Sequence, residues 1–258
     1  MIRIITILIS LAIIGCSTSD EKWLIEKSEG YQIHFSADDA DDLSDYKLLF
    51  ENGISSVREF FQDTFKDTFD IYIHPNRASL DQQWQTDWNM PDFNSQCWMV
   101  ASGVANKFDL IAPAKWENEA CEHSYANRLK TQRLITHELV HVYHGQLNKS
   151  PDFSEVYGID WFVEGLATFA SGQCDSTRVA DVQKAINEGN APGSLDSFWK
   201  GNLKYGLSGT MVWYMDDLYG RTTMKSLLPY NQLETILDTL NTSEAALLDG
   251  WEQFVIEL

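Results

Sequence analysis

The chain has 258 residues, with 19 Lys and Arg against 38 Asp and Glu, which gives a formal net charge of -19. A nucleic-acid-binding surface needs clustered cations that displace counterions from phosphates, so this balance argues against a nucleic-acid partner. Hydrophobic residues make up 44% and charged residues 22%, as in ordinary globular proteins, which excludes collagen-like repeats and long disorder. The length fits one domain, or two lobes around one cleft.

The first fifteen residues have the composition of an export signal. Arg3 is followed by an uninterrupted apolar or small stretch that stops at Cys16, after which the chain is polar. The stretch is shorter than the roughly 20 residues that a membrane-spanning helix needs, and its charged start and apolar middle are typical of a signal peptide. We therefore predict a signal peptide at residues 1–15, outside the fold, and an anchor and linker at residues 16–22.

The end of this segment, Ile13-Ile14-Gly15-Cys16, resembles a bacterial lipobox, in which the signal is removed before a cysteine that becomes lipidated. The resemblance implies a lipid anchor at Cys16 and a place in the bacterial cell envelope, and Ser17 favours the outer membrane. The alternative is an ordinary cleaved signal peptide whose cysteine lies near the cleavage site by chance.

Three further cysteines, Cys97, Cys121 and Cys174, belong to a chain that we expect to be exported, and export permits disulfides. We favour a bond between Cys97 and Cys121, because both precede the motif described below and the bond would close the segment between them. The sequence does not fix the connectivity. Three buried free thiols are the alternative.

The first half of the chain alternates between strand and helix patterns. Alternating apolar residues predict strands at 31–36 and 69–75, and one or two more within 99–113. Apolar residues recur at helical spacing over 46–60 and 78–88, where we expect helices. These elements predict an α+β lobe with a small mixed sheet over residues 23–147.

A long helical pattern runs from Glu117 to about Gln146, and nearly everything after the loop at Pro151 also has helical spacing. The last of these patterns is an apolar stripe over residues 247–258, with Thr242 or Ser243 as a helix cap before it. We therefore predict a mainly helical lobe over residues 148–258.

A His-Glu-x-x-His motif lies in the middle of the expected long helix. His137 and His141 are four residues apart and share a helix face, from which both imidazoles can bind one Zn²⁺ at about 2.0–2.1 Å. Glu138 lies one step round the helix, where a carboxylate can take a proton from zinc-bound water and deliver it to a leaving amine. A motif this short also occurs by chance, so a third ligand is needed.

Two residues are candidates for that third ligand. His144 shares the helix face of the motif, but the metzincin pattern needs His at position 147, where this chain has Leu147. We therefore favour His144 as a residue outside the metal sphere or at the helix end. Glu164 lies 23 residues after His141, within the segment WFVEGLA. Its alternative role is a solvated helix carboxylate.

The order and spacing of HELVH and WFVEGLA resemble the gluzincin superfamily of zinc metallopeptidases, which includes thermolysin and aminopeptidase N relatives. The resemblance implies a zincin-like fold of the α+β class and one zinc ion held by His137, His141 and Glu164, with Glu138 as general base. It also implies that a tyrosine from residues 193–220 reaches the active site. Tyr205 matches best, as a hydrogen-bond donor to the oxyanion, and an ordinary core or surface tyrosine is the alternative.

The sequence departs from these relatives at two places. Aminopeptidase N relatives carry a Gly-x-Met-Glu-Asn strand whose glutamate binds the substrate amine, but residues 103–106 contain no glutamate, so we do not expect aminopeptidase activity. Thermolysin relatives have an aspartate four residues after the ligand glutamate, which orients a zinc-bound histidine. This chain has Thr168 there, and Asp160 is a candidate substitute.

These motifs predict a zinc-dependent metallopeptidase that acts on a peptide or protein. We expect an extended substrate to pair with a strand edge within residues 100–109, and the acidic composition favours basic peptides. One alternative is a zincin-scaffold envelope lipoprotein with a binding or structural role. Another is a zinc hydrolase of non-peptide amides. The sequence indicates neither a cleavage preference nor an oligomeric state.

Overall fold

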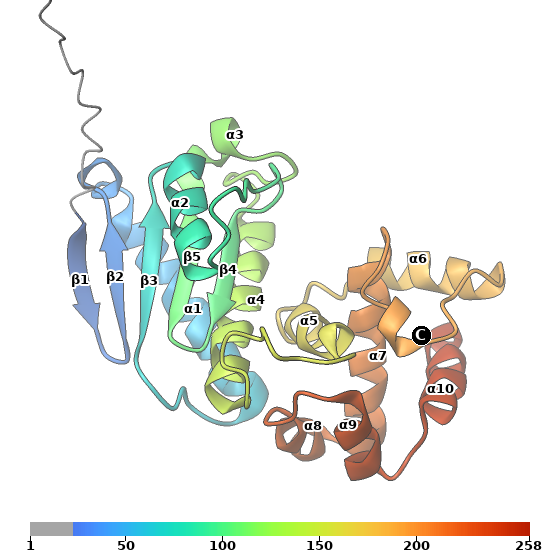
Figure 1. The fold of residues 1–258 in the computed structure, drawn as a ribbon. Coiled ribbons are helices and arrows are strands. Elements are labelled where there is room, and N and C mark those ends of the chain that lie inside the picture. The colour runs from blue at the N-terminus through green and yellow to red at the C-terminus, as the bar shows by residue number, and fades with distance from the viewer. Residues whose placement is uncertain (1–22) are drawn as a thin grey trace, which may run out of the picture.

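The computed structural model describes residues 23–258 and has a mixed α+β architecture (Figure 1). The predicted signal peptide and the predicted anchor at Cys16 lie outside the described residues. The strands are β1 (Leu24–Ser28), β2 (Tyr31–Phe35), β3 (Phe69–His74), β4 (Ala101–Val104) and β5 (Lys107–Ile111). The α-helices are α1 (Leu43–Phe61), α2 (Arg77–Asp87), α3 (Trp116–Glu119), α4 (Arg128–Leu147), α5 (Asp160–Ala170), α6 (Ser176–Asn187), α7 (Lys204–Tyr219), α8 (Arg221–Leu227), α9 (Leu233–Leu240) and α10 (Glu244–Glu257).

The five strands form one mixed sheet in the order β1-β2-β3-β5-β4. β2, β3 and β5 are parallel, whereas β1 and β4, at the two edges, run antiparallel to their neighbours. The register places Ile33, Ile71 and Phe108 in one row, and all three are fully buried. Alternation of apolar and polar residues thus gives one apolar face, which confirms the predicted small mixed sheet.

Helices cover both faces of this sheet (Figure 1). α1 packs against α4 on the apolar face, and α4 also runs along the edge strand β4. On the other face α2 contacts β3 and β5. A separate small cluster lies under α2 and consists of Leu80, Trp84, Val100, Ile111 and Trp116. α4 therefore packs against the sheet mainly through the edge strand β4.

Every regular element after α4 is a helix, which confirms the predicted helical second half. α5 lies along α7, and α10 packs against α6 and α7. The cap of α10 is Ser243, whose side chain accepts a hydrogen bond from the backbone N–H of Ala246, as one of the two predicted caps. One continuous cluster of buried apolar residues runs from the sheet to α10, so the two halves share a core.

One prediction of secondary structure is wrong, and one strand was not predicted. The expected helix from Glu117 to Gln146 is broken, because α3 ends at Glu119 and α4 begins at Arg128. Between them Glu122 has a left-handed backbone (φ 66°), and Asn127 caps α4 by accepting a hydrogen bond from the N–H of Lys130. The strand β1 was not predicted, because its side chains are mostly exposed and give no apolar alternation.

Within residues 23–258, no helix combines the length and the apolar composition needed to cross a membrane.

Candidate metal centre

The His-Glu-x-x-His motif lies in the buried middle of α4. Leu139, Val140 and Val142 are fully buried and fix the rotation of the helix in the core. His137 and His141 lie one turn apart, are 5% and 6% exposed, and have their Nε2 atoms 3.1 Å apart. The packing therefore directs both imidazoles to one point, as the four-residue spacing predicts.

Glu164, from α5, completes the group. Its Oε2 lies 3.4 Å from Nε2 of His137 and 3.6 Å from Nε2 of His141. Ligand atoms about 2.0–2.1 Å from a tetrahedral zinc ion lie about 3.3 Å from one another. The three separations match that value, and this is the only such group of His, Cys, Asp and Glu among residues 23–258. The residues present therefore fit a zinc ion.

A glycine sets the position of Glu164. A Cβ atom on Gly165 would lie 2.4 Å from the carbonyl oxygen of Ser208 on α7, closer than any side chain allows. Gly165 therefore lets α5 approach the backbone of α7, and the adjacent Glu164 is held over the two histidines. This close approach gives a physical reason for the Glu-Gly pair in the motif.

Glu138 lies between α4 and the edge strand β4. A Cβ atom on Gly103 would lie 2.2 Å from the backbone oxygen of Glu138, so only glycine allows β4 to approach the helix this closely. The carboxylate is half-buried and borders the same cavity as the three candidate ligands. Burial raises the pKa of Glu138 above its ordinary value, while the imidazoles of His137 and His141 oppose that rise.

The charges of the three candidate ligands support one another. Burial acts to raise the pKa of Glu164, but attraction to His141 and hydrogen bonds from both imidazoles bring it well below its ordinary range. Burial acts to lower the pKa of His141, yet Glu164 raises it overall. The ionised Glu164 therefore stabilises positive charge beside the two imidazoles, and a divalent cation bound there would have the same stabilisation.

The candidate ligands face a cavity of about 600 Å³. The whole of β4 borders this cavity, and β4 pairs with β5 on one side only, so its other edge is free for another strand. Aromatic residues Trp88, Trp98 and Trp199 border the cavity as well, whereas Trp84 is buried in the core under α2. The cavity therefore joins a free strand edge, aromatic surface and a cluster of metal-ligating groups.

Tyr205, at the start of α7, also borders the cavity. Its ring centre lies 6.2 Å from that of His137, and its ring meets Trp199 edge to face at 4.9 Å. Burial raises the pKa of Tyr205, and the nearby Glu164 and Glu138 raise it further, so the phenol keeps its proton. The structure thus brings the sequence-predicted Tyr205 to the same cavity as His137, Glu138, His141 and Glu164.

His144 is not in the group. It is fully buried, packs against Phe153 and Phe162, and has its Nε2 atom 3.4 Å from Nδ2 of Asn148. Burial lowers the pKa of His144 to about 3, so this imidazole is neutral at ordinary pH. His144 therefore lies in the last turn of α4 and outside the group, as the unmatched metzincin spacing predicts.

In the described part of the chain, no carboxylate outside the group forms a hydrogen bond to either imidazole. The Nδ1 atoms of His137 and His141 have no hydrogen-bond partner among residues 23–258. Thr168 is fully buried with its hydroxyl unpartnered, and Asp160 borders the cavity without a bond to either ring. The suggestion that Asp160 substitutes for the aspartate of thermolysin relatives therefore gains no support. Packing in α4 orients the rings instead.

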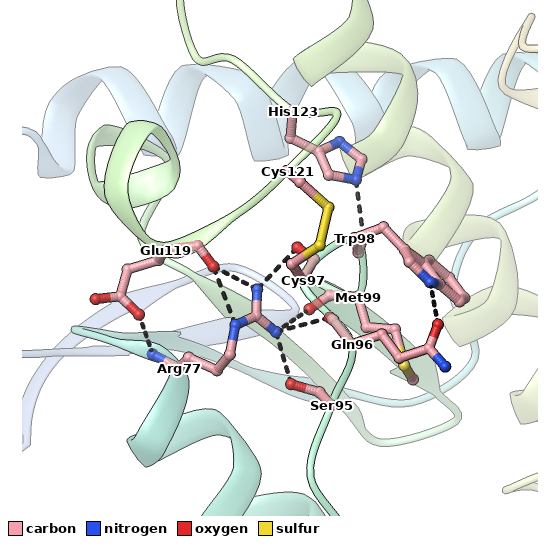
Figure 2. The surroundings of a disulfide bond; sticks show 9 residues. All are labelled: Arg77, Ser95, Gln96, Cys97, Trp98, Met99, Glu119, Cys121 and His123. Atoms are coloured by element: carbon pink, nitrogen blue, oxygen red, sulfur yellow. Dashed lines mark hydrogen bonds between the residues drawn. A yellow bond between two sulfur atoms is a disulfide. The ribbon is translucent and has the colours of Figure 1, made fainter.

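One wall of the cavity is a pair of loops that we call the disulfide strap, residues 95–99 and 119–123 (Figure 2). Cys97 and Cys121 are bonded, which confirms the favoured pairing, and Cys174 is free. The loops are also joined by hydrogen bonds, from the N–H of Cys121 to the oxygen of Cys97 (3.1 Å) and between Nε2 of His123 and the oxygen of Trp98 (2.9 Å). These bonds hold Trp98 at the cavity.

Arg77 anchors the disulfide strap to the start of α2 (Figure 2). Its guanidinium donates to backbone oxygens in both loops, including those of Met99 at 2.8 Å and Glu119 at 3.0 Å. It also donates to the hydroxyl of Ser95 at 2.6 Å. One planar cation thus satisfies carbonyl groups that a short irregular loop cannot pair within itself.

Sequence reasoning missed the two cations of the cavity, Arg178 and Lys204, and the ring of Trp199. Arg178 lies on α6, and Lys204 begins α7 next to Tyr205. Only Lys204 and Trp199 had a signal in the sequence, because they lie in the segment 193–220 that was singled out for its tyrosine. Their convergence depends on the packing of α6 and α7, which no local pattern encodes.

Chemically, the arrangement can hold a divalent cation with an acid, Glu138, and a phenol, Tyr205, at the same cavity. Comparison with known proteins adds no assignment. No family model matches the chain, and no curated protein matches it in sequence.

Proposed function

We propose that this protein is a zinc-dependent metallopeptidase of the gluzincin type, with a zincin-like fold. The observation that carries the proposal is the convergence of His137, His141 and Glu164, whose ligand atoms lie 3.1 to 3.6 Å apart beside a free strand edge. Catalytic zinc sites are built from sets such as two histidines and a glutamate with an open position, and these three side chains match that set.

In this proposal His137, His141 and Glu164 hold the ion, and zinc supplies a Lewis acid that polarises a carbonyl and makes water more acidic. Glu138 takes the proton of the attacking water. Burial raises its pKa, which makes the Glu138 carboxylate a stronger proton acceptor than an exposed one. The backbone of Gly103 keeps Glu138 in place.

Tyr205 is proposed to stabilise the oxyanion. Its phenol remains protonated beside the carboxylates and can donate a hydrogen bond to charge that develops on the substrate carbonyl. An extended peptide would add to the free edge of β4, where backbone N–H and C=O groups align a chain without regard to its sequence. Such pairing places successive peptide bonds along α4, beside Glu138.

The proposal extends to localisation. We propose that the chain is exported and anchored to the bacterial envelope through a lipidated Cys16, on the strength of the resemblance of residues 13–16 to a lipobox. The Cys97–Cys121 bond supports an oxidising compartment, because structural disulfides persist outside the cytosol.

The decisive experiment compares the zinc-loaded protein with its Glu138→Gln variant on a diverse peptide mixture analysed by mass spectrometry. We expect cleavage to fall by about 10²- to 10⁴-fold in the variant, because it loses the proton acceptor and keeps the shape of the side chain. Zinc content, measured by elemental analysis, should stay at one ion per chain. Glu252→Gln, an exposed position on α10, is the matched control and should cleave normally.

Each outcome separates the alternatives. A protein with intact His137, His141 and Glu164 that binds no stoichiometric zinc would contradict the proposal. Stoichiometric zinc without cleavage of any peptide would favour a binding role or a hydrolase of non-peptide amides. Cleavage that persists in Glu138→Gln and resists a chelator would point to a contaminating enzyme.

A further inference from the structure

Two cations border the cavity, Arg178 and Lys204, and they are the only Lys or Arg residues that do so in the part of the chain that the structure describes. Neither forms an ion pair with a carboxylate of residues 23–258. The chain carries 38 acidic against 19 basic residues, so acidic partners are abundant. Two cations that face a cavity without such a partner keep their charge available to a ligand.

Aromatic rings surround the ammonium of Lys204. Its Nζ lies 4.4 Å from the ring centre of Trp199, and 5.2 Å from the ring centres of both Trp98 and Tyr205. Rings attract the cation through their faces but accept few hydrogen bonds, so they fix its place and leave its N–H donors unused. They also displace water, which strengthens the attraction of the ammonium for an incoming anion.

Arg178 lies beside the same ring. Its Cζ is 5.7 Å from the centre of Tyr205, and its Nη1 donates to the backbone oxygen of Gln173 at 2.6 Å. This hydrogen bond fixes the guanidinium of Arg178. Its acceptor is an uncharged carbonyl oxygen, so the positive charge of Arg178 is not neutralised. We call these two cations, with the rings of Trp98, Trp199 and Tyr205, the cationic wall.

The cationic wall lies next to the candidate metal centre, because the ring centre of Tyr205 lies 5.2 Å from Nζ of Lys204, 5.7 Å from Cζ of Arg178 and 6.2 Å from the ring centre of His137. An extended chain advances about 3.3 Å per residue, so a group at this wall belongs to a residue within about three positions of the bond at the metal centre. The cationic wall can therefore contact a substrate residue close to the cleaved bond and contribute to specificity.

Three acids not used by the proposed chemistry also border the cavity, Glu122, Asp152 and Asp160. They and the overall charge would favour a basic substrate. All three residues are exposed, however, and water and salt screen exposed charges. The ammonium of Lys204 instead lies among three aromatic rings, so water screens its charge less than it screens the three carboxylates.

We propose that the cationic wall is a carboxylate-binding subsite, and that Lys204 is its main determinant of specificity. The inference rests on the proposed function and names its substrate class: peptides that carry a carboxylate within about three residues of the cleaved bond, as a C-terminus or as an Asp or Glu side chain. Lys204 forms a charge-assisted hydrogen bond to that carboxylate, and Arg178 adds a second cation.

Calorimetry on the zinc-loaded Glu138→Gln protein tests this without turnover. The probes are one N-acetylated peptide as a free acid, its C-terminal amide, and amides with Glu, Gln or Lys two residues from the end. We expect a carboxylate to tighten binding by about tenfold or more, as hydrogen bonds to charged groups do. The free acid and the Glu amide show which carboxylate is bound.

The variant Lys204→Met keeps a flexible chain among the rings but removes the charge, and it should erase the preference. Lys204→Arg should retain it. Lys184→Met, on an exposed turn of α6, removes the same charge away from the cavity and should change nothing. Thermal unfolding of each variant shows that it is folded, so that lost binding is not mistaken for lost structure.

Equal binding of acids and amides, tighter binding of a Lys-containing amide, or an acid preference that survives in Lys204→Met would each overturn the subsite. The last result would mean that the carboxylate binds the metal directly. Repeating the titration on chelator-treated protein separates the two proposals, because the subsite belongs to the chain itself. Failure to bind zinc contradicts only the metallopeptidase, whereas loss of acid preference contradicts only the cationic wall.

Discussion

The candidate metal centre and the disulfide strap border one cavity but are held in place by different means. His137, His141 and Glu164 project from α4 and α5, whose apolar faces are buried in the core, so close packing sets their positions. The disulfide strap has little regular structure and depends on the Cys97–Cys121 bond and on Arg77. Helices thus supply fixed metal-ligand geometry, whereas the loops need cross-links. Removing a metal ligand should therefore leave the disulfide strap in place, and removing the disulfide should leave the metal ligands in place.

The largest expected effect comes from a substitution that disrupts the candidate metal centre and leaves the disulfide strap intact. In the intact protein, zinc at about 1,000 times its dissociation constant should raise the free energy of unfolding by about 4 kcal/mol. Glu164→Gln loses the anionic ligand and should lose most of that increase, while Cys97 and Cys121 stay bonded. Urea unfolding with and without zinc measures the difference. An undiminished zinc effect in the variant would remove Glu164 from the ligand set.

A smaller effect is expected from removing the disulfide bond of the strap while the candidate metal ligands stay intact. The Cys97–Cys121 bond closes a loop with a sequence separation of 24, and its loss in the double serine variant should cost about 2–4 kcal/mol of unfolding free energy. Zinc stoichiometry should not change, because no ligand lies on the strap. Cys174→Ser, at the free cysteine, is the matched control. Loss of zinc in the double variant would show that the two regions are coupled.

Gly103→Ala tests the point where the two regions meet. The added methyl group would overlap the backbone of Glu138, so β4 and α4 must move apart, at an expected cost of about 1–3 kcal/mol. Cleavage should fall as well, because β4 both supports Glu138 and borders the cavity. Gly193→Ala, where a Cβ meets nothing within 4 Å, should stay within about 0.5 kcal/mol of the parent. Equal stability of the two variants would contradict the close contact.

The smallest effect concerns the start of α4, the helix that carries His137 and His141. A hydrogen bond from Arg128 (2.6 Å), and another from Tyr125, lower the pKa of Asp45. Because the folded pKa is lowered, the ion pair stabilises the protein above the unfolded pKa of about 3.9, and that stability is lost as pH falls through the folded value.

Asp45 is well exposed, so the contribution should be below about 1 kcal/mol. Asp45→Asn should reduce the loss of stability between about pH 6 and pH 3, as measured by urea unfolding. Asp41→Asn, at an exposed neighbouring position, is the control. Identical pH profiles for the parent and Asp45→Asn would remove the ion pair from the stability of the helix start.

What could be predicted from the sequence is what local spacing encodes. Four residues return a helix to the same face, so the meeting of His137 and His141 follows from the sequence alone. The positions of Glu164 and Tyr205 came from a resemblance, and the structure gives the physical reason for the first in the close approach of Gly165 to α7. The alternating patterns likewise predicted β2, β3 and the apolar sheet face.

What could not be predicted depends on contacts between distant residues. The chain leaves the helix between α3 and α4, where Cys121 is bonded to the distant Cys97. The helical pattern of the sequence continues across this break and therefore does not reveal it. Lys204 meets Trp98 only because α7 packs against α5 while the strap is anchored by Arg77. Neither contact changes the spacing of apolar residues, so the sequence pattern could not predict them.

The shared core has a consequence for the cooperativity of the whole molecule. Trp251 on α10 is fully buried and donates its indole N–H to the hydroxyl of Thr210 on α7, and α7 in turn supports α5 and Glu164. No boundary in the buried cluster separates these helices from the sheet. Unfolding should therefore occur as one transition, and damage at the far end of the chain should lower zinc affinity without touching a ligand.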